Sequence, residues 1–438
     1  MKYIITTLGC KVNQYETQAM ETLLTSHGHM PAEKGETADA VIVNTCAVTA
    51  ESGRKSRQLI RRLHEENPGA VLAVCGCYSQ LEPDEAESLG AHVIFGAADR
   101  TKLVEAVERT VEERNKEREE PLCRNIDEPF KRRAIERLPA GAVSGRTRAM
   151  LKIQDGCVNF CTYCIIPYTR GRLCSLPIEE AARETARIAQ EGFRELVLTG
   201  IEVASYGVDL PGKPTLADVI TACAEVSGDM RIRLGSLEPT VITEDFCRRL
   251  ADTDKLCRHF HLSLQSGCDK TLKAMNRKYD TARFFAATEL LREYFPGCGI
   301  TCDLITGFPS ETEQDHAETL AFIQKCAFSD MHVFPYSRRP GTPADKMDGQ
   351  CPRAVKERRA KEARDIAHEM KLAFLEQSIG KTLPVLFETP ADADFTGHSD
   401  TYLLVRAQGE ELRGKTLNVK ITSCEGEILC GEIENAEA

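Results

Sequence analysis

Three cysteines lie close together in the stretch GCVNFCTYC, residues 156–164. Cys157, Cys161 and Cys164 are separated by four and then three positions, and a short strand pattern precedes them. Organised cysteine spacing in a reducing compartment is typical of metal ligands rather than of disulfides. Buried structural cysteines are a weaker alternative, because three cysteines within eight residues directly after a strand rarely arise by coincidence.

The number of cysteines in this stretch bears on which metal it holds. A structural zinc site uses four ligands in a closed tetrahedron. The next cysteine, Cys174, lies ten residues further on without a paired Cys or His. An iron–sulfur cluster held by three cysteines instead leaves one iron open. Such an iron is useful only when a substrate or cofactor binds to it, so the spacing favours a [4Fe–4S] cluster with one exchangeable position.

The string GCVNFCTYCIIPYTRGR, with its CxxxCxxC spacing, resembles the radical S-adenosylmethionine (SAM) enzymes. The resemblance implies that SAM chelates the fourth iron through its amino and carboxylate groups. It also implies that an electron from the cluster cleaves SAM and releases a 5′-deoxyadenosyl radical. The aromatic residue before the last cysteine, Tyr163, is then expected near the adenine of SAM.

A second set of cysteines is spread over the amino-terminal segment. Cys10 in TLGCKVNQYE, Cys46 in NTCAVT and Cys77 in VCGCYSQ each follow a predicted strand. The carboxyl ends of parallel strands meet at one edge of a sheet, so these three thiols are expected to converge. Unrelated loop cysteines are the alternative. Cys75 falls inside its strand, and we therefore assign Cys77 to a second three-cysteine cluster.

With both sets present, the whole chain resembles the methylthiotransferase family. The motifs TLGCKVNQYE, CTYCIIPYTRG, LTGIEVASYG and QSGCDKTLKAMNRKY resemble the threonylcarbamoyladenosine branch. Other branches typically carry glutamine or proline where Lys11 stands. The resemblance implies 2-methylthiolation of N6-threonylcarbamoyladenosine next to the anticodon of tRNA, with two SAM molecules and two [4Fe–4S] clusters. It also implies an electron donor and a sulfur source.

Two other functions stay open. The ribosomal-protein branch of the family modifies an aspartate, and an acidic carboxy-terminal segment suits a basic protein substrate. Residues 376–438 hold twelve acidic and five basic residues. A protein of a different class, a metal-dependent RNA-binding protein with zinc at the cysteines and no catalysis, is the second alternative.

Residues at the carboxyl ends of the core strands are expected to contact SAM, because a barrel of this kind builds its site there. They are Thr199, Gly200, Ile201, Ser236, Glu238, Gln265 and Asp303. Local capping is the alternative role for each polar one. RNA contacts are expected from arginines, which bind phosphate bidentately. The candidates are Arg338, Arg339, Arg170 and Arg172, with Arg277 and Lys278 in addition, and an ordinary solvated face is the alternative.

The predicted elements place these motifs in an α/β multidomain fold. Residues 1–120 alternate strand and helix, with strands at 3–8, 40–44, 71–75 and 93–95, which predicts a parallel α/β domain for the second cysteine set. Residues 121–145 are predicted to be a basic linker. Residues 146–372 are predicted to form the radical SAM core, a partial (β/α)6 barrel, with a doubly wound sheet as the alternative. Its strands are expected at 150–154, 195–199, 231–235, 259–264, 300–305 and 331–335. Residues 376–438 are predicted to form a small β-barrel that resembles a TRAM domain.

Composition sets the broader limits. The chain has 438 residues, 42% of them hydrophobic, and a net charge of −11. No apolar run approaches the roughly 20 residues that span a bilayer, and the start lacks a signal-peptide pattern, so a cytoplasmic protein without a membrane partner is expected. Nothing demands an oligomer, so a monomer is expected. Of the 19 cysteines, eight are expected to be buried apolar side chains: Cys223, Cys247, Cys257, Cys298, Cys302, Cys326, Cys424 and Cys430.

Overall fold

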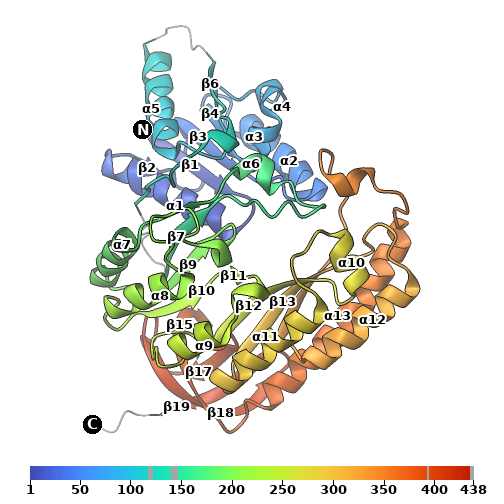
Figure 1. Ribbon diagram of the computed structural model, residues 1–438. Coiled ribbons are helices and arrows are strands. Elements are labelled where there is room, and N and C mark those ends of the chain that lie inside the picture. Colours follow the sequence, from blue (N-terminus) through green and yellow to red (C-terminus); the bar gives the residue numbers. More distant parts are fainter. Residues whose placement is uncertain (117–121, 140–146, 392–393, 435–438) are drawn as a thin grey trace.

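The amino-terminal segment forms a six-stranded parallel sheet in the computed structural model, which describes residues 1–116, 122–139, 147–391 and 394–434 (Figure 1). Parts of the predicted linker and the ends of the first and last predicted domains lie outside these described residues. The strand order is β2-β1-β3-β4-β5-β6. The strands are β1 (Lys2–Thr7), β2 (Met30–Pro31), β3 (Ala40–Thr45), β4 (Val71–Gly76), β5 (Val93–Phe95) and β6 (Cys123–Asn125).

Helices cover both faces of this sheet. Apolar side chains of α1 (Lys11–Ser26) and α5 (Arg100–Asn115) pack on one face. The other face is covered by α2 (Ala50–Glu66), α3 (Cys77–Leu81) and α4 (Pro83–Ser88). The four predicted strands are all present, and the linker prediction is corrected in one respect. Strand β6 pairs in parallel with β5, so part of the predicted linker belongs to the sheet. Its polar sequence, CRN, gives no strand signal.

The middle of the chain forms an open, partial barrel, as predicted. All six predicted strands are present, as β7 (Arg148–Asp155), β9 (Glu195–Gly200), β10 (Arg231–Leu234), β12 (His259–Gln265), β13 (Gly299–Thr306) and β14 (Asp330–Pro335). Two short strands, β8 (Cys174–Ser175) and β11 (Ser236–Leu237), complete orders of β10-β9-β7-β8 and β11-β12-β13-β14. Gly235 alone separates β10 from β11, so the two sheets form one curved wall.

Helices surround the outside of this wall. They are α7 (Ile178–Gln190), α8 (Leu216–Glu225), α9 (Glu244–Ala251), α10 (Asp269–Ala274), α11 (Thr281–Tyr294), α12 (Glu313–Cys326) and α13 (Arg353–Glu376). The short α6 (Ile166–Arg170) instead lies against α3 of the amino-terminal domain. Short 3-10 helices are η1 (Pro129–Lys131), η2 (Val203–Ser205), η3 (Pro239–Val241) and η4 (Pro343–Lys346). Alternate strand residues such as Phe260, Leu262 and Leu264 are buried among apolar side chains of these helices. Because side chains alternate along a strand, His259 and His261 face the interior of the barrel.

The carboxy-terminal segment forms a closed five-stranded barrel in the order β15-β16-β17-β19-β18. Its strands are β15 (Thr382–Ala391), β16 (Asp394–Ser399), β17 (Leu404–Gln408), β18 (Thr416–Glu425) and β19 (Ile428–Ile433). Strand β16 was not predicted, because its sequence DFTGHS is polar. The burial prediction is wrong for Cys424 and Cys430, which are only partly buried, and right for the other six cysteines.

The carboxy-terminal barrel closes the amino-terminal end of the core barrel (Figure 1). Arg233 of β10 donates to the backbone carbonyls of Ser399 and Asp400 at 3.0 and 2.9 Å. The ring of Tyr402 stacks on His259, the first residue of β12, with centroids 4.9 Å apart. The opposite end of the core barrel, where its strands finish, faces the amino-terminal sheet. None of the described helices is long and apolar enough to cross a membrane.

Candidate active site

The first cysteine set occupies a tight loop at the carboxyl end of β7. Gly156 has a φ of +76°, and a Cβ at this position would lie 1.8 Å from the backbone oxygen of Arg172. The Cys157 amide donates to the oxygen of Gly171 at 3.0 Å, and the Cys164 amide donates to Cys161 at 2.9 Å. Backbone contacts therefore fix the three thiols at one end of the barrel.

A buried guanidinium lies against this loop. Arg277 Nη1 is 3.2 Å from the sulfur of Cys161, and Nη2 is 2.8 Å from Glu238 Oε1. The Arg277 side chain is only 5% exposed. This burial contradicts the prediction that Arg277 contacts RNA. The residue instead joins the sulfur of Cys161 to the carboxyl group of Glu238, so it positions both at the cysteine loop.

Two carboxyl groups converge near the same loop. Asn159 Nδ2 lies 3.2 Å from Glu202 Oε2 and 3.2 Å from Glu238 Oε1. Burial and the neighbouring Glu238 raise the pKa of Glu202 to about 8. A pair of close carboxyl groups is suited to binding an ammonium group. Glu202 was not among the predicted site residues, although it directly follows Ile201 in the motif LTGIE.

The remaining predicted SAM-contact residues lie at the same end of the barrel. Thr199 is buried and Gly200 partly buried at the end of β9, with Ile201 next to them. Ser236 Oγ is 3.0 Å from Ser263 Oγ, and Gln265 ends β12 with a φ of 65°. The structure thus brings these residues to the rim that carries the cysteine loop.

Tyr163 lies within the cysteine loop, between Thr162 and Cys164. Its ring meets Phe308 edge to face, with centroids 6.5 Å apart. It packs beside the small apolar cluster of Met275, Phe308 and Tyr336. An aromatic ring held there can contact a flat ligand bound beside the cysteines.

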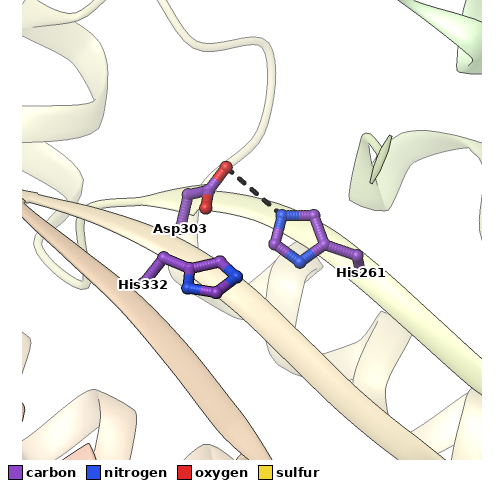
Figure 2. Close-up of side chains that lie close together, drawn as sticks. All are labelled: His261, Asp303 and His332. Carbon is purple, nitrogen blue, oxygen red and sulfur yellow. Dashed lines mark ion pairs between the residues drawn. The ribbon is translucent and has the colours of Figure 1, made fainter. Parts of the chain in front are cut away.

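Asp303 lies in a polar group inside the barrel that the sequence did not reveal (Figure 2). It pairs with His261 Nε2 at 3.2 Å, and His332 from the next strand points toward both. Ligand atoms of these three residues all lie within 4.8 Å of one another. Thr301 holds the other nitrogen of His261 at 2.9 Å. The two histidines come from β12 and β14, which flank β13, and only the strand register brings them together.

The second cysteine set comes together at the edge of the amino-terminal sheet. Cys10 caps α1, Cys46 follows β3 and Cys77 begins α3. A Cβ at Gly9 would lie 3.1 Å from Cys46 Sγ, so the loops of Cys10 and Cys46 are in contact. Burial, together with the Cys77 and Cys46 thiols, raises the pKa of Cys10 to about 11, although the nearby Arg170 lowers it.

Cys75 is separated from this set. It is fully buried within the sheet, among side chains such as Tyr3 and Leu24. Burial raises the pKa of Cys75 to about 11, and the charges acting on it are those of Arg100, Glu16 and other charged residues rather than another thiol. The geometry therefore favours Cys77 over Cys75, as the sequence pattern did.

The two cysteine sets face one another. Burial raises the pKa of the Cys164 thiol to about 12, and Cys77 of the other set adds to this shift. Among the described residues, the three cysteine sulfurs of each set do not all lie within 4.8 Å of one another. A single tetrahedral zinc ion would require such a short spacing. The wider spacing suits a multi-iron cluster, and binding of a metal would displace the thiol protons.

A buried ion cluster joins the two halves of the site. Glu16 of α1 accepts hydrogen bonds from Arg170, from Lys152 at 3.1 Å and from Arg100 at 3.2 Å. Arg170 also donates to Asn13 at 2.9 Å, and Asn13 holds the backbone oxygens of Leu8 and Thr45, next to the two cysteine loops. Arg170 is 1% exposed, so the prediction that it contacts RNA is wrong.

The other four predicted RNA contacts differ in exposure. Arg339 is buried, which contradicts its predicted place on an open RNA-binding surface. Arg338 is exposed, and its Nε pairs with Asp345 at 2.6 Å. Arg172 beside the cysteine loop and Lys278 are also exposed. Of the six candidates, Arg338, Arg172 and Lys278 are available to a large ligand.

Two protein-family models match the chain. One, described as Uncharacterized protein family UPF0004, matches residues 2–96, and the other, Radical SAM superfamily, matches residues 151–323. The latter begins in β7 and includes the whole Cys157 loop. The fold and the site thus define a radical SAM protein.

Named relatives show which family of radical SAM proteins the chain resembles. A threonylcarbamoyladenosine tRNA methylthiotransferase MtaB of Bacillus subtilis (strain 168) is 38% identical, over 95% of this chain and 92% of the relative. Its counterpart in Thermotoga maritima is 34% identical, over 97% and 96%. A tRNA-2-methylthio-N(6)-dimethylallyladenosine synthase of Alkaliphilus oremlandii is 34% identical, over 99% and 92%. The chain belongs to the radical SAM tRNA methylthiotransferase family.

Solved structures agree on the fold alone. The radical SAM methyltransferase TsrM of Kitasatospora setae superposes with a TM-score of 0.57 at 14% identity, covering 89% of this chain and 79% of that one. The cobalamin-dependent radical SAM enzyme OxsB matches with a TM-score of 0.50 at 12% identity, over 84% and 56%.

Proposed function

We propose that this protein attaches a methylthio group to C2 of N6-threonylcarbamoyladenosine in tRNA, with two [4Fe–4S] clusters and two SAM molecules. The observation that carries the proposal is the meeting of two three-cysteine sets, one after β7 and one at the edge of the amino-terminal sheet. The names of the two MtaB relatives favour the threonylcarbamoyl substrate.

The roles of the cysteines follow from their places. Cys157, Cys161 and Cys164 would hold the cluster that binds SAM, and Cys10, Cys46 and Cys77 the auxiliary cluster that carries sulfur. When bound, the clusters and SAM supply the radical, the methyl group and the sulfur that an unreactive aromatic C–H requires. An electron donor and a sulfur source complete the requirements.

Other side chains would bind and orient SAM. Glu202 and Glu238 would hold its amino group, and Asn159 keeps the two carboxyl groups together. Tyr163 would lie against the adenine. Thr199, Gly200, Ile201, Ser236, Gln265 and Asp303 would line the rest of the site. Arg277 would position the sulfur of Cys161 and the carboxyl group of Glu238.

An aromatic surface beside the cysteine loop supports RNA as the substrate. Phe130, Phe160 and Tyr168 are all exposed, and the rings of Phe130 and Phe160 stack with centroids 6.2 Å apart. Exposed Arg172 lies near this group, and Arg338 lies on the loop that follows β14. Aromatic rings that stack on unpaired bases, with nearby arginines for phosphates, are typical of single-stranded RNA recognition.

Nucleoside mass spectrometry tests the substrate. A strain that lacks the gene should lose 2-methylthio-N6-threonylcarbamoyladenosine from its tRNA and regain it when the wild-type gene is restored. Unchanged levels of this nucleoside in the deletion strain would reject the proposed substrate.

Three cysteine variants test the two clusters. Cys157→Ala should abolish SAM cleavage, whereas Cys77→Ala should retain SAM cleavage, lose the auxiliary iron and lose methylthiolation. Cys75→Ala is the matched control, because this thiol lies two residues away but points into the sheet. If Cys75→Ala lost the auxiliary iron and Cys77→Ala kept it, the ligand assignment would be wrong.

A further inference from the structure

A cavity of about 340 Å³ lies where the three parts of the chain meet. Met150 of β7 and Val197 of β9 line it from the core barrel, Lys11 from α1 and Tyr402 from the carboxy-terminal barrel. Its volume is within the range of about 300–1,000 Å³ that is usual for small-ligand sites. The site derived above does not use this cavity.

The strand register places the cavity relative to the cysteine loop. Met150 pairs with Val197, and two residues further on Lys152 pairs with Thr199. Thr199 lies near the carboxyl end of β9, at the proposed SAM site. Two residues of a strand span about 7 Å, so the cavity lies about that far below Thr199, toward the floor formed by Tyr402. C2 and C6 of adenine flank the same ring nitrogen, N1, so a base that presents C2 to the proposed SAM site directs its N6 substituent to one side, and an extended threonylcarbamoyl group can reach this space.

The cavity has a cationic lining. Lys11, Arg148 and Arg413 contribute positive charge, and Glu388 is the acidic residue among the lining side chains. Glu388 is already paired with Arg148 Nε at 2.7 Å and with His398. Glu388 is therefore not the partner of the Lys11 ammonium group, which a further acidic group in this cavity could pair with.

Lys11 is the cation available to a ligand. Within the part of the chain that the structure describes, its ammonium group forms no hydrogen bond and no salt bridge. The side chain remains accessible to solvent through the cavity. An ammonium group without a partner, in a space that already contains other cations, favours an anionic ligand.

We propose that this cavity binds the N6 substituent of the substrate adenosine and that Lys11 pairs with the carboxylate of its threonyl group. This inference rests on the proposed function and adds the residue that selects the substituent. The name of the Alkaliphilus relative specifies a dimethylallyl group for that protein. This group has no carboxylate, so Lys11 would not increase the affinity for it. Lys11 is thus a specificity-determining residue.

Binding measurements with paired ligands test the proposal. Two RNA hairpins would be compared, one with N6-threonylcarbamoyladenosine and one with its threonine methyl ester, on holoenzyme with clusters and SAM bound. Wild-type protein should bind the acid at least about tenfold more tightly, because a hydrogen bond to a charged group contributes about 1.5–3 kcal/mol. Lys11→Gln should reduce this preference to less than about threefold, and Lys11→Arg should keep most of it.

The preference is a ratio within one protein, so a change in cluster content caused by the proximity of Lys11 to Cys10 cancels. Lys102→Gln on α5, whose side chain is 66% exposed, is the control and should leave the preference intact. An unchanged preference in Lys11→Gln would overturn the inference. Equal loss of affinity for both hairpins would overturn it as well, because it would mean a phosphate contact or a structural role.

Different experimental results would reject the proposed function and the inference about Lys11. Wild-type enzyme that binds both hairpins but forms no methylthio product would reject the proposed function. Wild-type enzyme that forms the product, together with an unchanged acid preference in Lys11→Gln, would reject the inference alone.

Discussion

At the scale of single residues, Gly156 decides whether the cysteine loop can form. A side chain there would meet the backbone oxygen of Arg172 at 1.8 Å, and this oxygen cannot move without displacing the loop. The positive φ of +76° adds a cost of about 1–2 kcal/mol for any residue with a Cβ.

Gly156→Ala should therefore lower the free energy of unfolding by more than this conformational cost and should reduce iron incorporation at Cys157, Cys161 and Cys164. Gly192→Ala is a matched control, because Gly192 has a φ of +87° with no atom within 4 Å of its added Cβ. Urea unfolding and iron analysis of both variants measure the difference. Equal losses in the two variants would show that the contact with Arg172 has no effect.

At the scale of elements, α1 and α6 connect the amino-terminal sheet to the core. Glu16 on α1 and Arg170 on α6 are both about 1% exposed or less, and Lys152 and Arg100 bind the same carboxylate. Because Asn13 joins Arg170 to the loop of Cys10, the same contact fixes one cysteine set relative to the other.

Arg170→Met should lower the free energy of unfolding by about 1.5–3 kcal/mol, because it removes a charged hydrogen-bond donor from Glu16 while Lys152 and Arg100 still compensate this carboxylate. Arg248→Met is the control, because Arg248 pairs with Asp245 on an exposed helix face and should contribute less than about 1 kcal/mol. Chemical unfolding of both variants gives the comparison. A loss at Arg170 no larger than at Arg248 would contradict the assigned role of the ion cluster.

The ion cluster around Glu16 and Arg170 shows which features the sequence could predict and which it could not. The repeated succession of strand and helix patterns predicted every main strand of the core, because those strands consist mostly of buried residues. It missed β6 and β16, whose residues are mostly polar. Local motif reading placed Arg170 on the RNA surface, because its partner Glu16 lies 154 residues away in the chain. The convergence of Cys10, Cys46 and Cys77 was predictable from strand ends, whereas the group of His261, Asp303 and His332 depended on strand register.

At the scale of the whole molecule, a buried carboxylate links the core to the carboxy-terminal barrel. Burial alone would raise the pKa of Glu195, but Arg233 and Arg231 outweigh this effect and lower its pKa from 4.5 to about 2. Both arginines also donate to backbone carbonyls of the carboxy-terminal barrel. The ionised carboxylate is therefore part of what holds the two barrels together.

A lowered pKa makes this contact sensitive to acid. The stabilisation by Glu195 should be complete above pH 4.5 and should be lost as the pH falls toward 2, a change of about 3 kcal/mol. Glu195→Gln should unfold at a lower temperature at pH 7 and show a weaker dependence of the melting temperature on pH between 4.5 and 2. Calorimetry across this range measures it, and parallel pH profiles for both proteins would contradict the prediction.

The floor of the core barrel is contributed by Tyr402 and its neighbours, near the end of the chain. Because a ribosome releases a protein from its amino terminus onward, the cysteine loops are made long before this floor exists. A nascent chain that has reached α13 already contains all six of these cysteines in an open-ended barrel. The compartment that would enclose a reactive radical is consequently closed only after Tyr402 has been made, when both cysteine sets have already emerged.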